Sequence, residues 1–238
     1  MKSIFSSLVQ SPYIINTRSF LRKNSIGRKF LAYLSTKISK GYESNFESAL
    51  LRYIKAGDIV WDIGANIGYY TEQILSQVGN EGKVIACEPS PLSAQLCRKI
   101  PNKGNLIVIE SALGSKTGTT YFSLNDDPTS PTNKLSNYGK TSNSIEVEIT
   151  TGDNIFQELG YTPNVIKIDV EGAEIEVLRG MQKVLNSSDL RAIFIEVHSQ
   201  ILEQNGYHDA IKIITQILNN NGFNINWTDF SHIEAIRK

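Results

Sequence analysis

From residue 58 onward, short and largely apolar runs alternate with segments whose apolar residues recur at helical spacing. Runs of this kind are typical of strands that are buried on both faces of a parallel sheet. Five such strands are predicted, at residues 58–63, 83–88, 105–113, 164–170 and 191–198. Strands and helices in alternation predict an α/β fold, with helices on both faces of a mostly parallel sheet.

The connecting segments carry helix signals. Apolar residues recur at helical spacing from Ile67 to Val78 and stop at Gly79, which indicates a helix C-terminus. Ser90 and Pro91 stand where an N-cap and a first helical residue are expected. Further helices are predicted at residues 174–187 and around Ile211, Ile214 and Leu218, followed by two closing strands at residues 223–230 and 232–238.

Residues 114–151 interrupt this alternation. The segments GTTYFSL (118–124) and IEVEITT (145–151) alternate apolar and polar residues, and the polar residues 125–144 separate them. Alternation with a period of two is typical of antiparallel strands. The pattern predicts a hairpin with a long loop, inserted between the third and fourth main strands. This loop and the basic N-terminal segment are the parts of the chain that we expect to cover a substrate.

The first forty residues differ in charge from the remainder. They hold eight basic residues and no acidic residue, whereas the whole chain has a formal net charge of zero. Apolar residues between Ile26 and Ile38 fall at helical spacing, so residues 1–40 are predicted to form a basic helical segment ahead of one domain at residues 41–238. A structural cap, a surface that contacts a membrane or polyanion, and an organelle-targeting peptide are the interpretations that stay open for this segment. Nucleic acid is not expected as a partner, because no recognition module accompanies the charge.

The composition limits the classes of protein that fit. At 238 residues and 40% hydrophobic content, the chain can bury one substantial core. Two cysteines, Cys87 and Cys97, are too few for a disulfide framework. No apolar run approaches the roughly 20 residues that span a bilayer, and we expect no secretory signal. A cytoplasmic protein is therefore predicted, with peripheral membrane contact through the basic N-terminus as the alternative.

Acidic residues stand where the predicted strands end. Asp62, Glu88, Asp169 and Glu196 lie at the ends of the first, second, fourth and fifth strands, and His198 follows two residues after Glu196. In open α/β sheets a ligand lies beyond the carboxyl ends of the strands, so these side chains are candidates for a binding site. Helix capping and solvated strand ends are the structural alternatives.

The turn in VWDIGANIGYY (60–70) favours a cationic cofactor over a dinucleotide. A dinucleotide site needs the pattern G-x-G-x-x-G, in which glycines let the backbone approach a pyrophosphate. Asn66 and Tyr69 replace the second and third of these glycines. Asp62 would repel a diphosphate, but it would attract the ammonium and sulfonium groups of S-adenosylmethionine. Glu88 lies where a carboxylate could accept hydrogen bonds from both ribose hydroxyls.

Four motifs together resemble one family. GDIVWDIGANIG, ACEPSP, SALGSKTG and KIDVEGAE resemble the FkbM-type methyltransferases, a branch of the class I S-adenosylmethionine-dependent methyltransferases, over roughly residues 41–200. The resemblance implies a three-layer Rossmann-like fold, in which a seven-stranded and mostly parallel sheet has an antiparallel last strand. It also implies O-methylation of a hydroxyl, often on a sugar or a polyketide-like product.

The resemblance further implies which residues bind S-adenosylmethionine. The turn residues Asp62, Gly64, Asn66 and Gly68 would hold the methionine end, Glu88 the ribose, and Ser111 with Ala112 the adenine edge. Glu43, which precedes the first strand, is a further candidate for the amino-acid part of the cofactor. A helix-start acid is the alternative role for Glu43.

Methyl transfer to a hydroxyl needs an in-line geometry and a group that takes the proton. Asp169 ends the fourth strand, where this fold brings an acceptor to the methyl group, and Glu171 follows at the turn. Glu196 and His198 are expected on one face of the fifth strand, and the ordinary pKa of histidine would let His198 act as a base near neutral pH. These four residues are the catalytic candidates. Helix capping, dipole compensation and a buried Glu196–His198 pair are the structural alternatives.

A divalent metal held by Asp169, Glu171 and His198 is not expected, because carboxylates with an imidazole suit Mg²⁺ or Mn²⁺ only moderately. Lys167 shares a strand face with Asp169 and is expected to be its ion-pair partner. The two other histidines, at positions 208 and 232, are expected to be ordinary surface or helix-start residues.

The sequence thus predicts an S-adenosylmethionine-dependent O-methyltransferase with a small-molecule or glycan acceptor. Two alternatives are a non-catalytic S-adenosylmethionine-binding protein on the same fold and, less favoured, an NAD-dependent oxidoreductase. Enzymes that methylate amines commonly carry an Asn or Asp followed by Pro-Pro and an aromatic residue at the end of the fourth strand. Residues 169–172 read Asp-Val-Glu-Gly instead, which argues against an amine acceptor.

Overall fold

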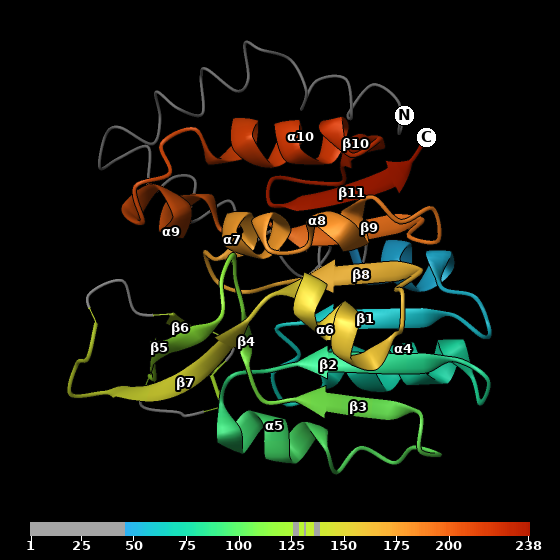
Figure 1. Cartoon of the computed structure of the whole chain (residues 1–238), viewed down its shortest axis with the longest axis horizontal. Helices are drawn as coiled ribbons and strands as arrows, with labels where there is room; N and C mark the ends of the chain where they lie inside the picture. The colour runs from blue at the N-terminus through green and yellow to red at the C-terminus, as the bar shows by residue number, and fades with distance from the viewer. Residues whose placement is uncertain (1–45, 126–128, 131, 136–138) are drawn as a thin grey trace.

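The computed structural model describes residues 46–125, 129–130, 132–135 and 139–238. Its centre is a seven-stranded sheet with the strand order β10-β11-β9-β8-β1-β2-β3 (Figure 1). The last strand, β11, runs antiparallel to both of its neighbours, and the other neighbouring strands pair in parallel. The predicted mostly parallel sheet with an antiparallel last strand is therefore confirmed. The strands are β1 (Ile59–Ile63), β2 (Lys83–Cys87), β3 (Leu106–Ile109), β8 (Val165–Ile168), β9 (Ala192–Glu196), β10 (Phe223–Trp227) and β11 (His232–Arg237).

Helices cover both faces of this sheet because successive residues of its central strands are apolar on opposite sides. Ile166 of β8 packs in one hydrophobic cluster with α6, α7, α8 and α10. Its neighbour Val165 packs in a second cluster, with α4 and the helical residues 46–53. The result is the three-layer arrangement that the sequence predicts. The helices are α4 (Tyr69–Val78), α5 (Pro91–Cys97), α6 (Gly152–Leu159), α7 (Glu174–Arg179), α8 (Gln182–Leu185), α9 (Ser199–Gln204) and α10 (Ala210–Asn220).

The helix boundaries follow the sequence signals with one exception. α4 ends at Gly79, and α5 begins with Pro91 after an N-cap at Ser90, both as predicted. The helix predicted over residues 174–187 is wrong, since Gly180 and the next residue separate α7 from α8. The carbonyl of Gly180 accepts a hydrogen bond from the amide of Asp153 at 3.0 Å, and a side chain at Gly180 would collide with the carbonyl of Gly114. A tertiary contact thus interrupts the helix.

A second, four-stranded sheet has the order β4-β7-β5-β6 and lies beside the carboxyl ends of the parallel strands (Figure 1). Its strands are β4 (Ala112–Leu113), β5 (Gly118–Ser123), β6 (Lys134–Leu135) and β7 (Ser144–Thr150). β5 and β7 pair antiparallel, as their alternating pattern predicts. The predicted third strand is too long, because β3 ends at Ile109 and residues 112–113 pair with β7 of the second sheet.

The predicted basic segment at residues 1–40 and the candidate Glu43 lie outside the described residues, so their roles stay predictions. Cys87 and Cys97 are free and buried. Among the helices that the structure describes, none is long and apolar enough to cross a membrane.

Candidate active site

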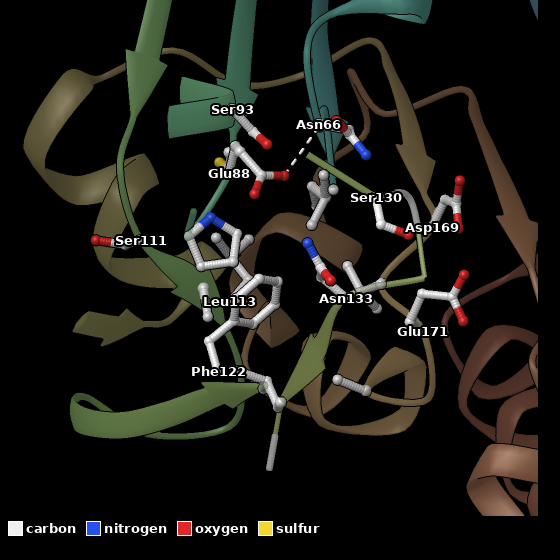
Figure 2. Close-up of a pocket in the computed structure, with 18 residues that line it drawn as sticks. Asn66, Glu88, Ser93, Ser111, Leu113, Phe122, Ser130, Asn133, Asp169 and Glu171 are labelled. Carbon is white, nitrogen blue, oxygen red and sulfur yellow. Dashed lines mark hydrogen bonds between the residues drawn. The ribbon is translucent and has the colours of Figure 1, made fainter. Parts of the chain in front are cut away.

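A cavity opens at the carboxyl ends of β1, β2 and β8 and is closed on one side by the second sheet (Figure 2). Together with the open solvent at its mouth, the space between the lining residues measures about 630 Å³. Figure 2 shows Glu88 and Ser111 on one side of this space and Asp169 and Glu171 on the other. The lining residues are Ile63, Gly64, Asn66, Cys87, Glu88, Pro89, Ser93, Ser111, Ala112, Leu113, Phe122, Ser130, Asn133, Leu135, Asp169, Val170, Glu171 and Ala173.

The glycine turn after β1 forms the floor of the cavity. Gly64 has a φ of 80° and its amide donates to the carbonyl of Cys87 at 2.9 Å. A side chain at Gly64 would collide with the carbonyl oxygen of Asp169, so the turn lies directly against the end of β8. Asn66 also has a positive φ, of 51°. Gly68 does not line the cavity; it is the left-handed N-cap of α4 and packs against Ile100.

Glu88, directly after β2, is held in place by the turn that it faces. One of its carboxylate oxygens accepts a hydrogen bond from the Asn66 amide at 2.9 Å, and the other accepts one from the Ser90 amide at 2.8 Å. The residue is 6% exposed, and burial raises the pKa of Glu88 although these amides act to lower it. A carboxylate that is fixed in this way presents its remaining lone pairs to the cavity.

Asp62, which the sequence places at the centre of cofactor recognition, does not line the cavity. Its side chain is fully buried, accepts a hydrogen bond from the Thr71 hydroxyl at 2.6 Å and lies 3.2 Å from the Lys167 ammonium. The direct attraction expected between Asp62 and a cationic cofactor is therefore not the role that its position supports. Register explains the difference, because Asp62 of β1 lies opposite Lys167 of β8.

Asp169 and Glu171 form the far wall of the cavity. The carboxylate of Asp169 lies 3.5 Å from the Lys167 ammonium, which confirms the predicted ion pair. Burial raises the pKa of Asp169, while the charge of Lys167 acts to lower it. Glu171 adopts a φ of 51°, and such a conformation is strained for a residue with a long side chain. Gly172 follows with a φ of 94° and completes the turn into α7.

His198 and Glu196 lie beside this wall but do not line the cavity. The Nδ1 atom of His198 is 2.8 Å from a carboxylate oxygen of Glu174, and its Nε2 atom is 3.4 Å from Glu171 and 3.8 Å from Glu196. Burial acts to lower the pKa of His198, but the hydrogen bonds and charges of Glu171 and Glu174 outweigh it and raise the pKa to about 11. The imidazole is therefore charged at neutral pH, and the ordinary histidine pKa on which its expected role as a base depended does not apply.

His232 is a buried residue, and the expectation of an ordinary surface or helix-start position was wrong. It begins β11, is 5% exposed and lies 2.7 Å from Asp229 and 3.5 Å from Glu196. Its ring centroid is 4.4 Å from that of Phe46. Because β11 runs antiparallel to β9, its first residue reaches the edge at which β9 ends. The antiparallel last strand was the signal that could have placed His232 there.

Asp169, Glu196 and His198 each place one potential ligand atom within 4.8 Å of the others. This set differs from the three metal ligands considered in the sequence, since Glu196 takes the place of Glu171. The donor types could hold a divalent cation. A site without a metal stays the prediction.

The second sheet forms one wall of the cavity. The sequence predicted its hairpin and loop as an insertion that covers a substrate, but it did not show which of their residues line the site. Phe122 of β5 and Leu135 of β6 give this wall an apolar surface. Ser130 and Asn133 add polar groups (Figure 2). Three of these residues belong to the 125–144 loop that was expected to cover a substrate. Ser111 and Ala112, the predicted adenine contacts, also line the cavity.

Comparison with known proteins gives three results. Residues 62–225 match the model of a family described as the methyltransferase FkbM domain. The hexuronic acid methyltransferase AglP of Haloferax volcanii is 32% identical over 156 residues, which are 64% of this chain and 61% of that protein. The chain thus matches less than two thirds of the length of this relative. A crystal structure of a putative rRNA-methylase from Clostridium thermocellum matches with a TM-score of 0.50 and 12% identity, over 82% of this chain and 96% of that one, which shows a shared fold.

Proposed function

Because the chain belongs to the FkbM methyltransferase domain family, we propose that it transfers a methyl group from S-adenosylmethionine to a hydroxyl group of a sugar-type acceptor. The observation that carries this proposal is one cavity lined by the glycine turn, by Glu88 and by the pair Asp169 and Glu171. The fold agrees, since it is the seven-stranded arrangement of class I methyltransferases.

The charge of the cavity fits S-adenosylmethionine. Three carboxylates line it, and no lysine or arginine is among the described lining residues. An anionic lining suits a cofactor with a sulfonium and an ammonium group and opposes a dinucleotide, whose diphosphate is anionic. We assign Glu88 to the ribose hydroxyls and Gly64 with Asn66 to the methionine end. Ser111 and Ala112 are assigned to the adenine edge.

We assign the acceptor to the opposite wall. The cofactor supplies an electrophilic methyl group, and the acceptor oxygen bonds to its carbon as the carbon–sulfur bond breaks, which leaves S-adenosylhomocysteine. Asp169 takes the hydroxyl proton, because burial raises its pKa and so makes it a stronger base than a solvated carboxylate. Glu171 holds the hydroxyl in line, and the charged His198 with Glu196 fixes the position of Glu171 rather than accepting a proton.

The acceptor class rests on the relative from Haloferax volcanii, which is named as a methyltransferase of a hexuronic acid. A hexuronic acid offers both hydroxyl groups and a carboxylate for methylation. Asp169 and Glu171 would repel an acceptor carboxylate placed next to them, so the proposal favours a hydroxyl of such a sugar.

Transfer of labelled methyl groups tests the proposal. The purified protein is incubated with methyl-labelled S-adenosylmethionine and a panel of neutral and hexuronic-acid-containing oligosaccharides, and the product is treated with mild alkali. A methyl ether survives this treatment, whereas a methyl ester is hydrolysed. Asp169→Asn should reduce the rate at least about a hundredfold, and Asp189→Asn, the same change at an exposed position, should not.

Three results would contradict parts of this proposal. Cofactor binding without transfer to any acceptor would indicate a non-catalytic binding protein. Label released entirely by alkali would move the reaction to a carboxylate. Binding of NAD in place of S-adenosylmethionine in calorimetry would overturn the cofactor assignment.

A further inference from the structure

Lys167 is a buried lysine that lies between the glycine turn and Asp169. It is 2% exposed and sits on the central strand β8. Its ammonium lies 3.1 Å from the carbonyl oxygen of Gly64, 3.2 Å from Asp62 and 3.5 Å from Asp169. The contact with Gly64 is a hydrogen bond, and the two carboxylates are ion-pair partners of the same ammonium. The ring of Tyr70 covers it, with the ammonium 4.9 Å from the ring centroid.

An ion pair alone would not require this arrangement. Burying an ammonium is costly unless it is paired, and the fully buried Asp62 already provides one opposite charge in cross-strand register. The two further contacts of the ammonium are with residues that follow the ends of β1 and β8. One goes to the cofactor turn at Gly64, and the other goes to Asp169 in the proposed acceptor wall.

The backbone around Lys167 leaves little freedom between these two contacts. The amide of Asp169 donates to the carbonyl of Ile63 at 3.0 Å, and the Asp169 carbonyl lies against Gly64. The Lys167 ammonium therefore completes a closed set of contacts that joins the turn after β1 to the end of β8. A shift of the Gly64 carbonyl would therefore move the Lys167 ammonium, and with it the carboxylate of Asp169.

We propose that Lys167 is a positioning residue that ties the cofactor turn to the acceptor carboxylate, with its ammonium fixing the Gly64 carbonyl and the Asp169 side chain in one arrangement. This inference rests on the proposed function, because it assigns Lys167 a part in both cofactor binding and the transfer step. Asp62 is then the balancing charge that makes the buried ammonium tolerable, which gives a reason for an acidic residue beneath the turn.

A double-mutant cycle separates this role from a purely structural one. Lys167→Met keeps an unbranched side chain that is one atom shorter, and it removes the charge and the donors. We expect it to raise the dissociation constant for S-adenosylmethionine about fivefold in calorimetry and to lower kcat at least about tenfold. In an Asp169→Asn background the same change should lower kcat less than about threefold, because the group that Lys167 positions is already removed, while its effect on cofactor binding remains.

Lys83→Met is the matched control. Lys83 begins β2 at the opposite end of the sheet, where its ammonium lies 4.8 Å from the ring centroid of Tyr161. It should leave kcat and cofactor affinity within about twofold of the wild type. If Lys167→Met does not fold, Lys167→Arg replaces it in the same double-mutant cycle. A guanidinium keeps the positive charge opposite Asp62, but its planar arrangement of donors does not match the positions of the Gly64 carbonyl and the Asp169 carboxylate.

A folded Lys167→Met protein with kcat and cofactor affinity within twofold of the wild type would overturn the inference. Equal losses of kcat in both backgrounds would also overturn it, since they would show that Lys167 does not act through Asp169. A wild-type protein that binds the cofactor and transfers no methyl group would instead defeat the proposed function. In that case the cofactor affinity of Lys167→Met alone still tests the contact with Gly64.

Discussion

Replacing Glu88 with alanine removes the one carboxylate that both faces the cavity and is held by backbone amides on each oxygen. If Glu88 binds the ribose of S-adenosylmethionine, the cofactor loses its only charged partner on that side of the cavity among the described lining residues. The affinity for the cofactor should therefore fall, while the fold is retained.

The size of the effect follows from the contacts. A hydrogen bond to a charged group contributes roughly 1.5–3 kcal/mol, so the loss of one ribose hydroxyl contact corresponds to a decrease in affinity of about 10- to 150-fold. The change also leaves the amides of Asn66 and Ser90 without their acceptors. Water can replace the carboxylate at the Asn66 amide, because Asn66 lines the cavity. Ser90 is buried, so the loss of an acceptor at its amide should lower the free energy of unfolding by about 1–3 kcal/mol.

Calorimetric titration with S-adenosylmethionine and urea unfolding measure the two quantities separately. Glu110→Ala is the control, since Glu110 is an exposed acidic residue that forms a surface ion pair with Arg98 at 2.7 Å. The affinity of this variant for S-adenosylmethionine should match that of the wild type. Glu88→Gln should fall between the two, because it keeps one acceptor oxygen. An affinity of Glu88→Ala within twofold of the wild type would refute the ribose assignment.

Three further predictions follow from the site. Gly64→Ala should abolish cofactor binding because its side chain would collide with the Asp169 carbonyl, and unchanged calorimetric affinity would contradict that contact. Burial acts to lower the pKa of His232, but Asp229 and Glu196 raise it from 6.5 to about 9; its stabilisation is therefore full below pH 6.5 and is lost as the pH rises through about 9. This loss should amount to on the order of 3 kcal/mol in urea unfolding, and a slope that is the same in Asp229→Asn would argue against it. Dialysis against EDTA should leave methyl transfer unchanged, whereas a rate that falls and returns with Mg²⁺ or Mn²⁺ would show a required metal.

Local signals predicted those parts of the fold that local interactions decide. The N-cap at Ser90 and the helix end at Gly79 depend on backbone groups within a few residues, and both appear as predicted. The apolar runs also placed the main strands, and the alternating period placed the pair β5 and β7. The carboxyl ends of parallel strands meet at one edge, so Glu88 and Asp169 could be expected at a common cavity.

Interactions between distant segments decided what the sequence could not predict. Asp62 and Glu88 both occur near strand ends, but only the cross-strand register shows that Asp62 faces Lys167 inside the sheet. The break before α8 depends on contact between Gly180 and Gly114. The charge of His198 depends on carboxylates from separate elements that surround it. These contacts join residues that are far apart in the sequence, so no periodic pattern of apolar and polar residues indicates them.

The glycine turn at the floor of the cavity and the second sheet at its side differ in how freely their residues can change. The glycine turn meets the end of β8 through backbone atoms, so a substitution there moves the main chain. The second sheet meets the cavity through side chains such as Phe122, Asn133 and Leu135, which can be exchanged without moving the parallel sheet. We therefore expect exchanges of residues on this hairpin to change which acceptor fits the cavity while the glycine turn stays intact. Substitutions along the glycine turn would disable the protein before they altered its choice of acceptor.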